Sequence, residues 1–62
     1  MSDIKIGTLV AARAGGNDII FGHVIDIKDI RYTVYWDNDY EAVYLYDTLL
    51  PYVKLIEQLK DN

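Results

Sequence analysis

The chain has 62 residues, enough for one domain, and folding at this size buries only about 60% of the unfolded chain's surface, which leaves no room for a deep catalytic cleft. A net charge of −4 excludes a phosphate-binding surface of the usual kind, because such surfaces need clustered Lys and Arg and the six basic residues here are scattered singly. We therefore expect one domain spanning residues 1–62, with a basic protein or peptide as its partner and no direct contact with nucleic acid.

The sequence contains no cysteine, which excludes disulfides and thiolate metal ligands and fits a reducing compartment. Residues 1–5 lack a basic region followed by an apolar run, and no segment approaches the ~20 apolar residues of a membrane span. We expect an intracellular protein, cytoplasmic or, in a eukaryote, nuclear, with no membrane partner.

The first half of the chain predicts two strands. Residues 9–13 are short and apolar, and the glycines and Asx residues of 14–18 supply the positive φ angles of a loop. Residues 19–28 are rich in β-branched and aromatic side chains, and Gly22 among them indicates a bend or bulge. Alternation over residues 25–28 directs the two isoleucines to one face and the two charged side chains to the other.

The next segment predicts a hairpin. A third strand over residues 32–36 and a fourth over residues 41–46 flank an acidic turn at 37–39. Successive side chains of a strand take opposite faces, so the fourth strand divides into an inward and an outward set. The inward set is Val43 and Leu45, and the outward set is Ala42, Tyr44 and Tyr46.

The C-terminal part predicts a single helical turn at residues 47–51 closed by Pro51, then a short fifth strand at 52–54. The apolar residues of 54–60 have the spacing of one face of a short helix. We expect this helix to close one end of the fold, and the alternative is that it docks on a partner. Short strands that recur roughly every 8–12 residues, with turns between them, predict an all-β fold, a five-stranded antiparallel barrel. Its expected core is Val10, Ala12, Ile25, Ile27, Val34, Val43, Leu45 and Leu50.

Residues 32–47 hold five of the six tyrosines and the only tryptophan, more aromatic surface than so small a core can bury. If Val34 points inward, Trp36 does too, and Tyr35 faces outward toward Tyr44 and Tyr46 across the hairpin. These three tyrosines are a candidate partner surface for another protein or for a second copy of the chain. The alternative is that their packing only stabilises an exposed sheet face.

Four segments, residues 6–12, 20–27, 32–41 and 45–51, resemble in their order the strands and turns of a Tudor domain, a member of the SH3-like small barrel superfamily. The resemblance covers about residues 6–53. It implies a five-stranded SH3-like barrel and an aromatic cage at one end, in which Tudor domains bind methylated lysine or arginine by cation–π attraction.

The resemblance assigns site residues one by one. Phe21 matches the aromatic residue that opens the second strand, and Trp36 matches the one that ends the third. Tyr40 lies close to the family's polar turn residue, and the carboxylates of Asp37 and Asp39 are expected beside these rings. The chain departs from the family at Ala14, where many members have an aromatic wall, and it lacks the Tyr-Gly-Asn turn. The implied site is an open notch for an arginine or an unmodified lysine.

Catalytic and metal chemistry have little support. With one histidine, one serine and no cysteine, a nucleophile and its base cannot be assembled, so we expect a protein that is not an enzyme. The run from Asp37 to Glu41 opens like a calcium loop, but Ala42 and Thr48 occupy the positions where such a loop has glycine and glutamate. We expect no metal and no cofactor.

The sequence thus favours a non-catalytic interaction module that binds a basic peptide or protein surface through an aromatic rim. One alternative is a small acidic inhibitor, of the kind found among phage accessory proteins, that mimics nucleic acid and blocks a nucleic-acid-binding protein or an enzyme. A second is a Tudor-like module associated with nucleic acid through stacked rings. The inhibitor would cluster its carboxylates at phosphate-like spacing, and these are Asp26, Asp29, Asp37, Asp39 and Glu41.

Overall fold

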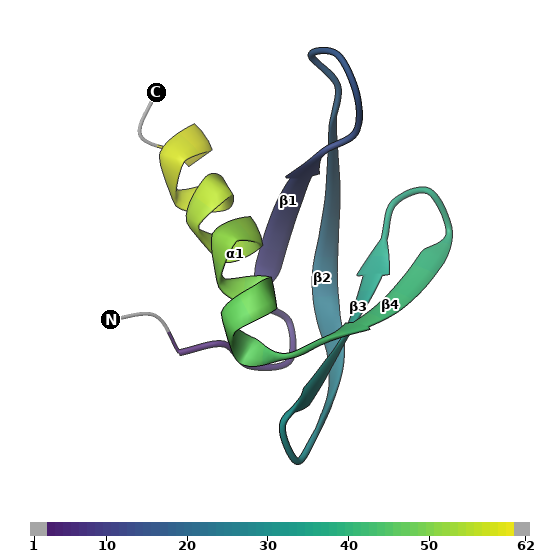
Figure 1. Cartoon of the computed structure of the whole chain (residues 1–62), viewed down its shortest axis with the longest axis vertical. Helices are drawn as coiled ribbons and strands as arrows, with labels where there is room; N and C mark the ends of the chain where they lie inside the picture. The colour runs from purple at the N-terminus through teal and green to yellow at the C-terminus, as the bar shows by residue number, and fades with distance from the viewer. Residues whose placement is uncertain (1–2, 61–62) are drawn as a thin grey trace.

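The computed structural model describes residues 3–60 and consists of an antiparallel sheet of four strands followed by one long helix (Figure 1). The elements are β1 (Leu9–Arg13), β2 (Ile19–Lys28), β3 (Arg31–Trp36), β4 (Tyr40–Tyr44) and α1 (Tyr46–Lys60). Each strand pairs with its neighbour in sequence, so the sheet order is β1-β2-β3-β4. Residues 1, 2, 61 and 62 of the predicted 1–62 domain lie outside the described part.

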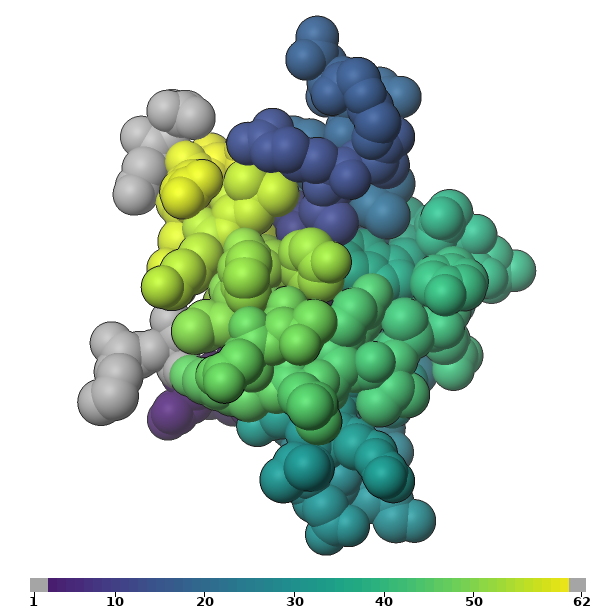
Figure 2. All heavy atoms as spheres, viewed as in Figure 1, coloured from purple at the N-terminus to yellow at the C-terminus, as the bar shows by residue number. Residues whose placement is uncertain are grey.

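Two aspartates make the tight turns of this meander. Asp29 between β2 and β3 has φ 56°, and Asp39 between β3 and β4 has φ 64°. Aspartate enters this left-handed region at lower cost than most side chains, because its short carboxylate bonds to nearby backbone. The second turn is closed by the Asp39 amide, which donates to the Trp36 carbonyl at 3.0 Å. The loops and turns project in different directions from the body of the molecule (Figures 1 and 2).

A β-bulge lies at Ile25. Val24 pairs with Val34, whereas Asp26 pairs with the next residue of β3, Thr33, so Ile25 is an extra residue on β2. The extra residue reverses the faces of β2 beyond it. As a result Ile27 lies on the buried face opposite Tyr32, and Asp26 faces solvent.

The core lies between one face of the sheet and α1, which packs chiefly against β1 and to a lesser extent against β3 (Figure 1). We call this the inner face and the opposite one the outer face. The core consists of side chains from the N-terminal arm, the inner face and one stripe of the helix: Ile4, Val10, Val24, Val34, Trp36, Leu49 and Val53. Leu49, Val53 and Ile56 are buried at the i, i+4, i+7 spacing that places them on one side of α1.

The predicted five-stranded barrel is wrong. The sheet is open, with β1 and β4 at its two edges, and the proposed fifth strand at residues 52–54 is part of α1. The helix begins at Tyr46 instead of residue 54 and continues through Pro51. Pro51 removes one helical hydrogen bond, but burial of Leu49 before it and Val53 after it holds both halves in one helix. The helix is neither long nor apolar enough, among the residues described, to cross a bilayer.

The expected core is only partly confirmed. Val10 and Val34 are buried, and Ala12, Ile27 and Leu50 are half-buried, but Ile25 is exposed at the bulge. Val43 is 58% exposed because the faces of β4 are the reverse of those predicted, and Leu45, expected in the fourth strand, is 52% exposed between β4 and α1. Val34 pairs with Ala42, and paired residues share a face, so the inner residues of β4 are Tyr40, Ala42 and Tyr44.

Candidate functional site

Three aromatic rings, those of Trp36, Tyr44 and Tyr52, pack together on the inner face next to the aliphatic core. The Trp36 ring meets the Tyr44 ring at 6.4 Å and the Tyr52 ring at 5.6 Å, both nearly perpendicular. The Tyr44 and Tyr52 rings lie 5.6 Å apart. The Trp36 Nε1 donates a hydrogen bond to the Tyr44 hydroxyl at 3.1 Å. With its polar atom satisfied and only 2% of its surface exposed, Trp36 stabilises the fold and presents no wall to a ligand.

Gly22 makes room for this indole. It pairs with Trp36, and a Cβ atom at Gly22 would lie 2.6 Å from the Tyr35 carbonyl oxygen and 2.9 Å from the Trp36 ring. The glycine therefore permits close packing of β2 and β3 and does not mark the predicted bulge, which lies three residues later at Ile25.

The five residues assigned by the Tudor resemblance are not brought together at one rim. Phe21 and Trp36 lie on opposite faces, because Phe21 precedes Gly22, the partner of Trp36. Tyr40 pairs with Trp36 and is exposed on the inner face. Asp37 and Asp39 are exposed in the turn between β3 and β4.

The predicted tyrosine surface is also divided. Tyr35 lies on the outer face, and Tyr44 lies on the inner face against Trp36 and Tyr52. Tyr46 is the first residue of α1, and its ring lies 6.2 Å from that of Tyr32. These three tyrosines therefore do not form one contact surface.

The outer face instead gathers a different set of aromatic and acidic side chains at the β3–β4 end. We call it the acidic corner, and its members are Phe21, His23, Tyr35, Asp37, Asp39 and Glu41. The Tyr35 hydroxyl donates to the Asp39 carboxylate at 2.8 Å, and the His23 ring lies 6.0 Å from the Tyr35 ring. Glu41 pairs with Tyr35 across the hairpin.

Phe21 joins the corner through the backbone. The Asp37 amide donates to the Phe21 carbonyl at 2.8 Å, so the two residues are adjacent across β2 and β3. The Phe21 side chain is 45% exposed on a face that α1 leaves open. An exposed ring beside carboxylates is a common feature of sites for cationic groups.

The corner has a negative potential that acts on Tyr35. The hydrogen bond to Asp39 raises the pKa of Tyr35, and the charge of Asp39, burial and the charges of Asp37 and Glu41 raise the pKa further. All three carboxylates thus oppose a tyrosinate at this position. The same field attracts a cation.

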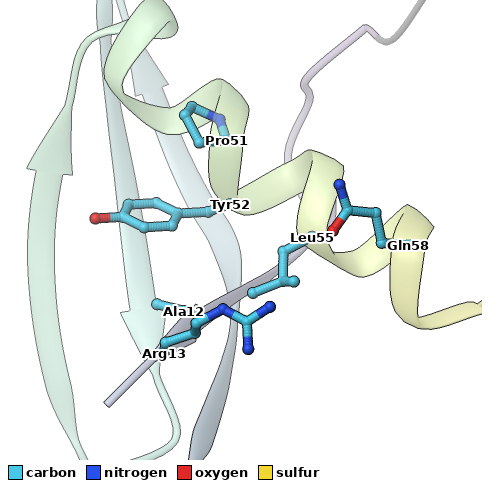
Figure 3. A pocket seen from close by; sticks show the side chains of 6 residues that line it. All are labelled: Ala12, Arg13, Pro51, Tyr52, Leu55 and Gln58. Carbon is cyan, nitrogen blue, oxygen red and sulfur yellow. The ribbon is translucent and has the colours of Figure 1, made fainter. Parts of the chain in front are cut away.

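A separate groove of about 400 Å³ runs between β1 and α1, away from the corner (Figure 3). Its lining residues are Ala12 and Arg13 of β1 and Pro51, Tyr52, Leu55 and Gln58 of α1. Arg13 is the one charged residue among them, so the groove offers nothing that would recognise a basic partner. In residues 3–60 no group of three or more His, Asp or Glu side chains is arranged to hold a metal ion.

Comparisons with protein families, with curated proteins and with solved structures gave no significant match to this chain. The geometry of the corner is therefore the basis for assigning a function.

Proposed function

We propose that the protein is a non-catalytic interaction module that binds a basic segment of another protein at the acidic corner. The observation that carries the proposal is the position of Tyr35. Its ring lies beside His23, its hydroxyl bonds to Asp39, and the charges of Asp37 and Glu41 act on it.

The corner offers two kinds of attraction to a lysine or arginine. The face of an aromatic ring attracts a cation with about 0.5–1 kcal/mol at an exposed site. An exposed carboxylate adds about 0.2–1 kcal/mol as an ion pair. Asp37 and Glu41 supply carboxylates, while Asp39 also orients Tyr35.

These magnitudes limit what one side chain achieves. A Kd of 1 mM already corresponds to about 4 kcal/mol, more than one cation at this corner supplies. The partner must therefore make additional contacts, and it must be a segment of chain rather than a single residue. Because Trp36 is buried, no closed cage surrounds the cation, and we expect little preference for methylated over unmodified lysine.

The distribution of carboxylates favours a module over an acidic inhibitor that mimics nucleic acid. Asp37, Asp39 and Glu41 surround Tyr35, whereas Asp26 pairs with Thr33 further along the sheet and Asp29 lies in the β2–β3 turn. The acidic groups thus accompany an aromatic ring instead of forming one continuous row.

The experiment is a titration of the isotope-labelled 62-residue protein with lysine- and arginine-containing peptides, methylated and unmodified, followed by amide and aromatic chemical shifts. We expect shifts at Phe21, His23 and Tyr35. The test variant carries Asp37→Asn, Asp39→Asn and Glu41→Gln. The control variant loses the same charge away from the corner, through Asp3→Asn, Asp18→Asn and Asp29→Asn.

The corner variant should weaken binding about tenfold or more, since about 1.4 kcal/mol is lost with every factor of ten. The control variant should weaken binding far less, because charges outside the corner act only through screened long-range attraction. Equal weakening in the two variants would mean that net charge alone attracts the peptide and would reject the corner as the site.

A further inference from the structure

We propose that the basic segment binds as a fifth strand on the free edge of β4. This inference rests on the proposed function, and it specifies the conformation and the side-chain pattern of the partner.

The two edges of the sheet differ. On the β1 side of the sheet, α1 packs against the strand and makes its largest contact with it (Figure 1). Ala11 in the middle of β1 is 0% exposed, backbone included. At the other edge, β4 pairs with β3 alone among the strands of residues 3–60. The sheet can therefore accept a new strand at β4.

The hydrogen bonds show which backbone groups of β4 are free. The Asp37 amide bonds to the Phe21 carbonyl on β2. Alternate residues of a central strand bond to opposite neighbours, so Trp36 and Val34 direct their backbone groups toward β4. Their partners Tyr40 and Ala42 direct theirs back toward β3. Glu41 and Val43 are left with an N–H and a C=O each that point away from the sheet.

The edge lacks most of the usual protections. Exposed edge strands are commonly blocked by charged side chains, lysine above all, by proline or by a bulge, and β4 has only the charge of Glu41. The segment Tyr40–Tyr44 has no lysine or proline, and its register with β3 is continuous. Tyr40 and Val43 are each 58% exposed beside the free backbone groups.

Charge selects the occupant. Glu41 is the one charged side chain of β4, and it lies in the acidic corner beside Tyr35. A second copy of the chain would bring another net charge of −4 to this edge, whereas a basic strand would neutralise Glu41. We therefore assign the edge to a basic strand of another protein.

The pattern of this strand follows from the faces of β4. On the outer face, the residue opposite Glu41 is lysine or arginine, and the residue two positions away, opposite Val43, is apolar. The residue between them faces the inner side opposite Ala42. The backbone bonds to Glu41 and Val43 supply affinity that a single cation lacks.

The first test adds the peptide Thr-Val-Thr-Lys-Thr-Val-Thr, whose symmetric pattern fits either strand direction, to the 62-residue protein. In the complex, the amides of Glu41 and Val43 should become protected from hydrogen exchange. Those of Ala42 and Tyr44 should be protected with and without peptide. Shifts at Phe21 and Tyr35 without new protection at Glu41 and Val43 would retain the corner but overturn strand addition. Absence of any shift at the corner would overturn the proposed function itself.

Two further comparisons test the strand without disturbing the fold. The first comparison uses two N-methylated peptides, one methylated at the backbone nitrogens of Lys and Val and the other at those of Thr. One of the two peptides should no longer bind, and the other should bind like the unmodified peptide. Equal sensitivity of both sets would overturn the proposal. In the protein, Val43→Pro removes an outward N–H and should abolish binding, while Val43→Thr keeps the N–H and should bind within a few-fold of the original chain.

Self-association decides between the two occupants. The free protein should remain monomeric in sedimentation at concentrations where the peptide binds. A dimer that protects the Glu41 and Val43 amides in the absence of peptide would overturn the assignment to a basic strand.

Discussion

The indole nitrogen of Trp36 and the hydroxyl oxygen of Tyr44 are joined by a hydrogen bond of 3.1 Å on the inner face of the sheet. The bond satisfies the only polar atom of the Trp36 side chain. Burial raises the pKa of Tyr44, and the bond from Trp36 acts in the opposite direction.

Replacement of Tyr44 by phenylalanine should destabilise the fold by about 1–3 kcal/mol, because the buried indole N–H loses its acceptor. Urea denaturation followed by Trp36 fluorescence would measure the change in the free energy of unfolding. Tyr40→Phe is the control, since Tyr40 is exposed on the same face. Equal losses in the two variants would show that the hydrogen bond contributes nothing.

The raised pKa values predict the alkaline limit of stability. Tyr35 and Tyr44 bind their protons more tightly in the folded chain. Their contribution to the free energy of unfolding is therefore complete below the ordinary tyrosine pKa of about 10 and is lost as the pH rises through the pKa values of the folded chain.

Asp39→Asn should lower the pKa of Tyr35, because it removes the negative charge and the hydrogen-bond acceptor that raise this pKa. Carbon chemical shifts of the tyrosine rings would measure this. Asp29→Asn makes the same change at another left-handed aspartate and should leave the pKa of Tyr35 in place.

Gly22→Ala should cost about 1–3 kcal/mol or more, because the new methyl group would overlap the Tyr35 carbonyl and the Trp36 ring. Trp36 fluorescence would report displacement of the indole ring, and the denaturant midpoint would report the loss of stability. Gly15→Ala is a comparison with open space around the new Cβ but φ 84°, so it should strain the loop and leave Trp36 fluorescence unchanged. An unchanged indole signal in Gly22→Ala would contradict the proposed packing.

Pro51→Ala should stabilise the protein by up to about 3 kcal/mol, because it restores a backbone N–H within α1 and removes the steric conflict of the ring. Thermal melts followed by helical circular dichroism would measure the change. A lower melting temperature would show that packing of the proline ring at the β1–α1 groove outweighs its cost to the helix.

The positions of the first four strands were largely predictable from local pattern, and so was the face that Val34 and Trp36 share, whereas the faces of β4 were not. The predicted strands at 9–13 and 19–28 coincide with β1 and β2, because glycines and aspartates mark their ends. The faces of β4 depend on turn length. Three residues separate Trp36 from its partner Tyr40, so even-numbered residues of both strands share the inner face. Alternation alone favours Val43 as the inward residue because it is aliphatic, and only the pairing reverses this.

The start of the helix and the arrangement of the candidate site were not predicted, for related reasons. Pro51 is a local signal to end a helix, whereas the burial of Leu49 and Val53 that overrides it exists only in the folded chain. The acidic turn at residues 37–39 and the exposed ring of Phe21 were identified from sequence. Trp36 was grouped with them because both rings lie at strand ends, and only the pairing of Gly22 with Trp36 shows that the two rings point to opposite sides.

The position of α1 along β1 also determines how far this sheet can grow. Filaments that grow by joining sheet edges need two exposed edges per molecule, one to template the next chain and one to accept the last. Here α1 packs beside one of those edges, where Ala11 in the middle of β1 is fully buried. A strand or a second molecule joined at β4 would therefore have α1 beside the opposite edge of the sheet. The position of α1 thus opposes polymerisation through both sheet edges, while the edge at β4 stays free to accept a strand.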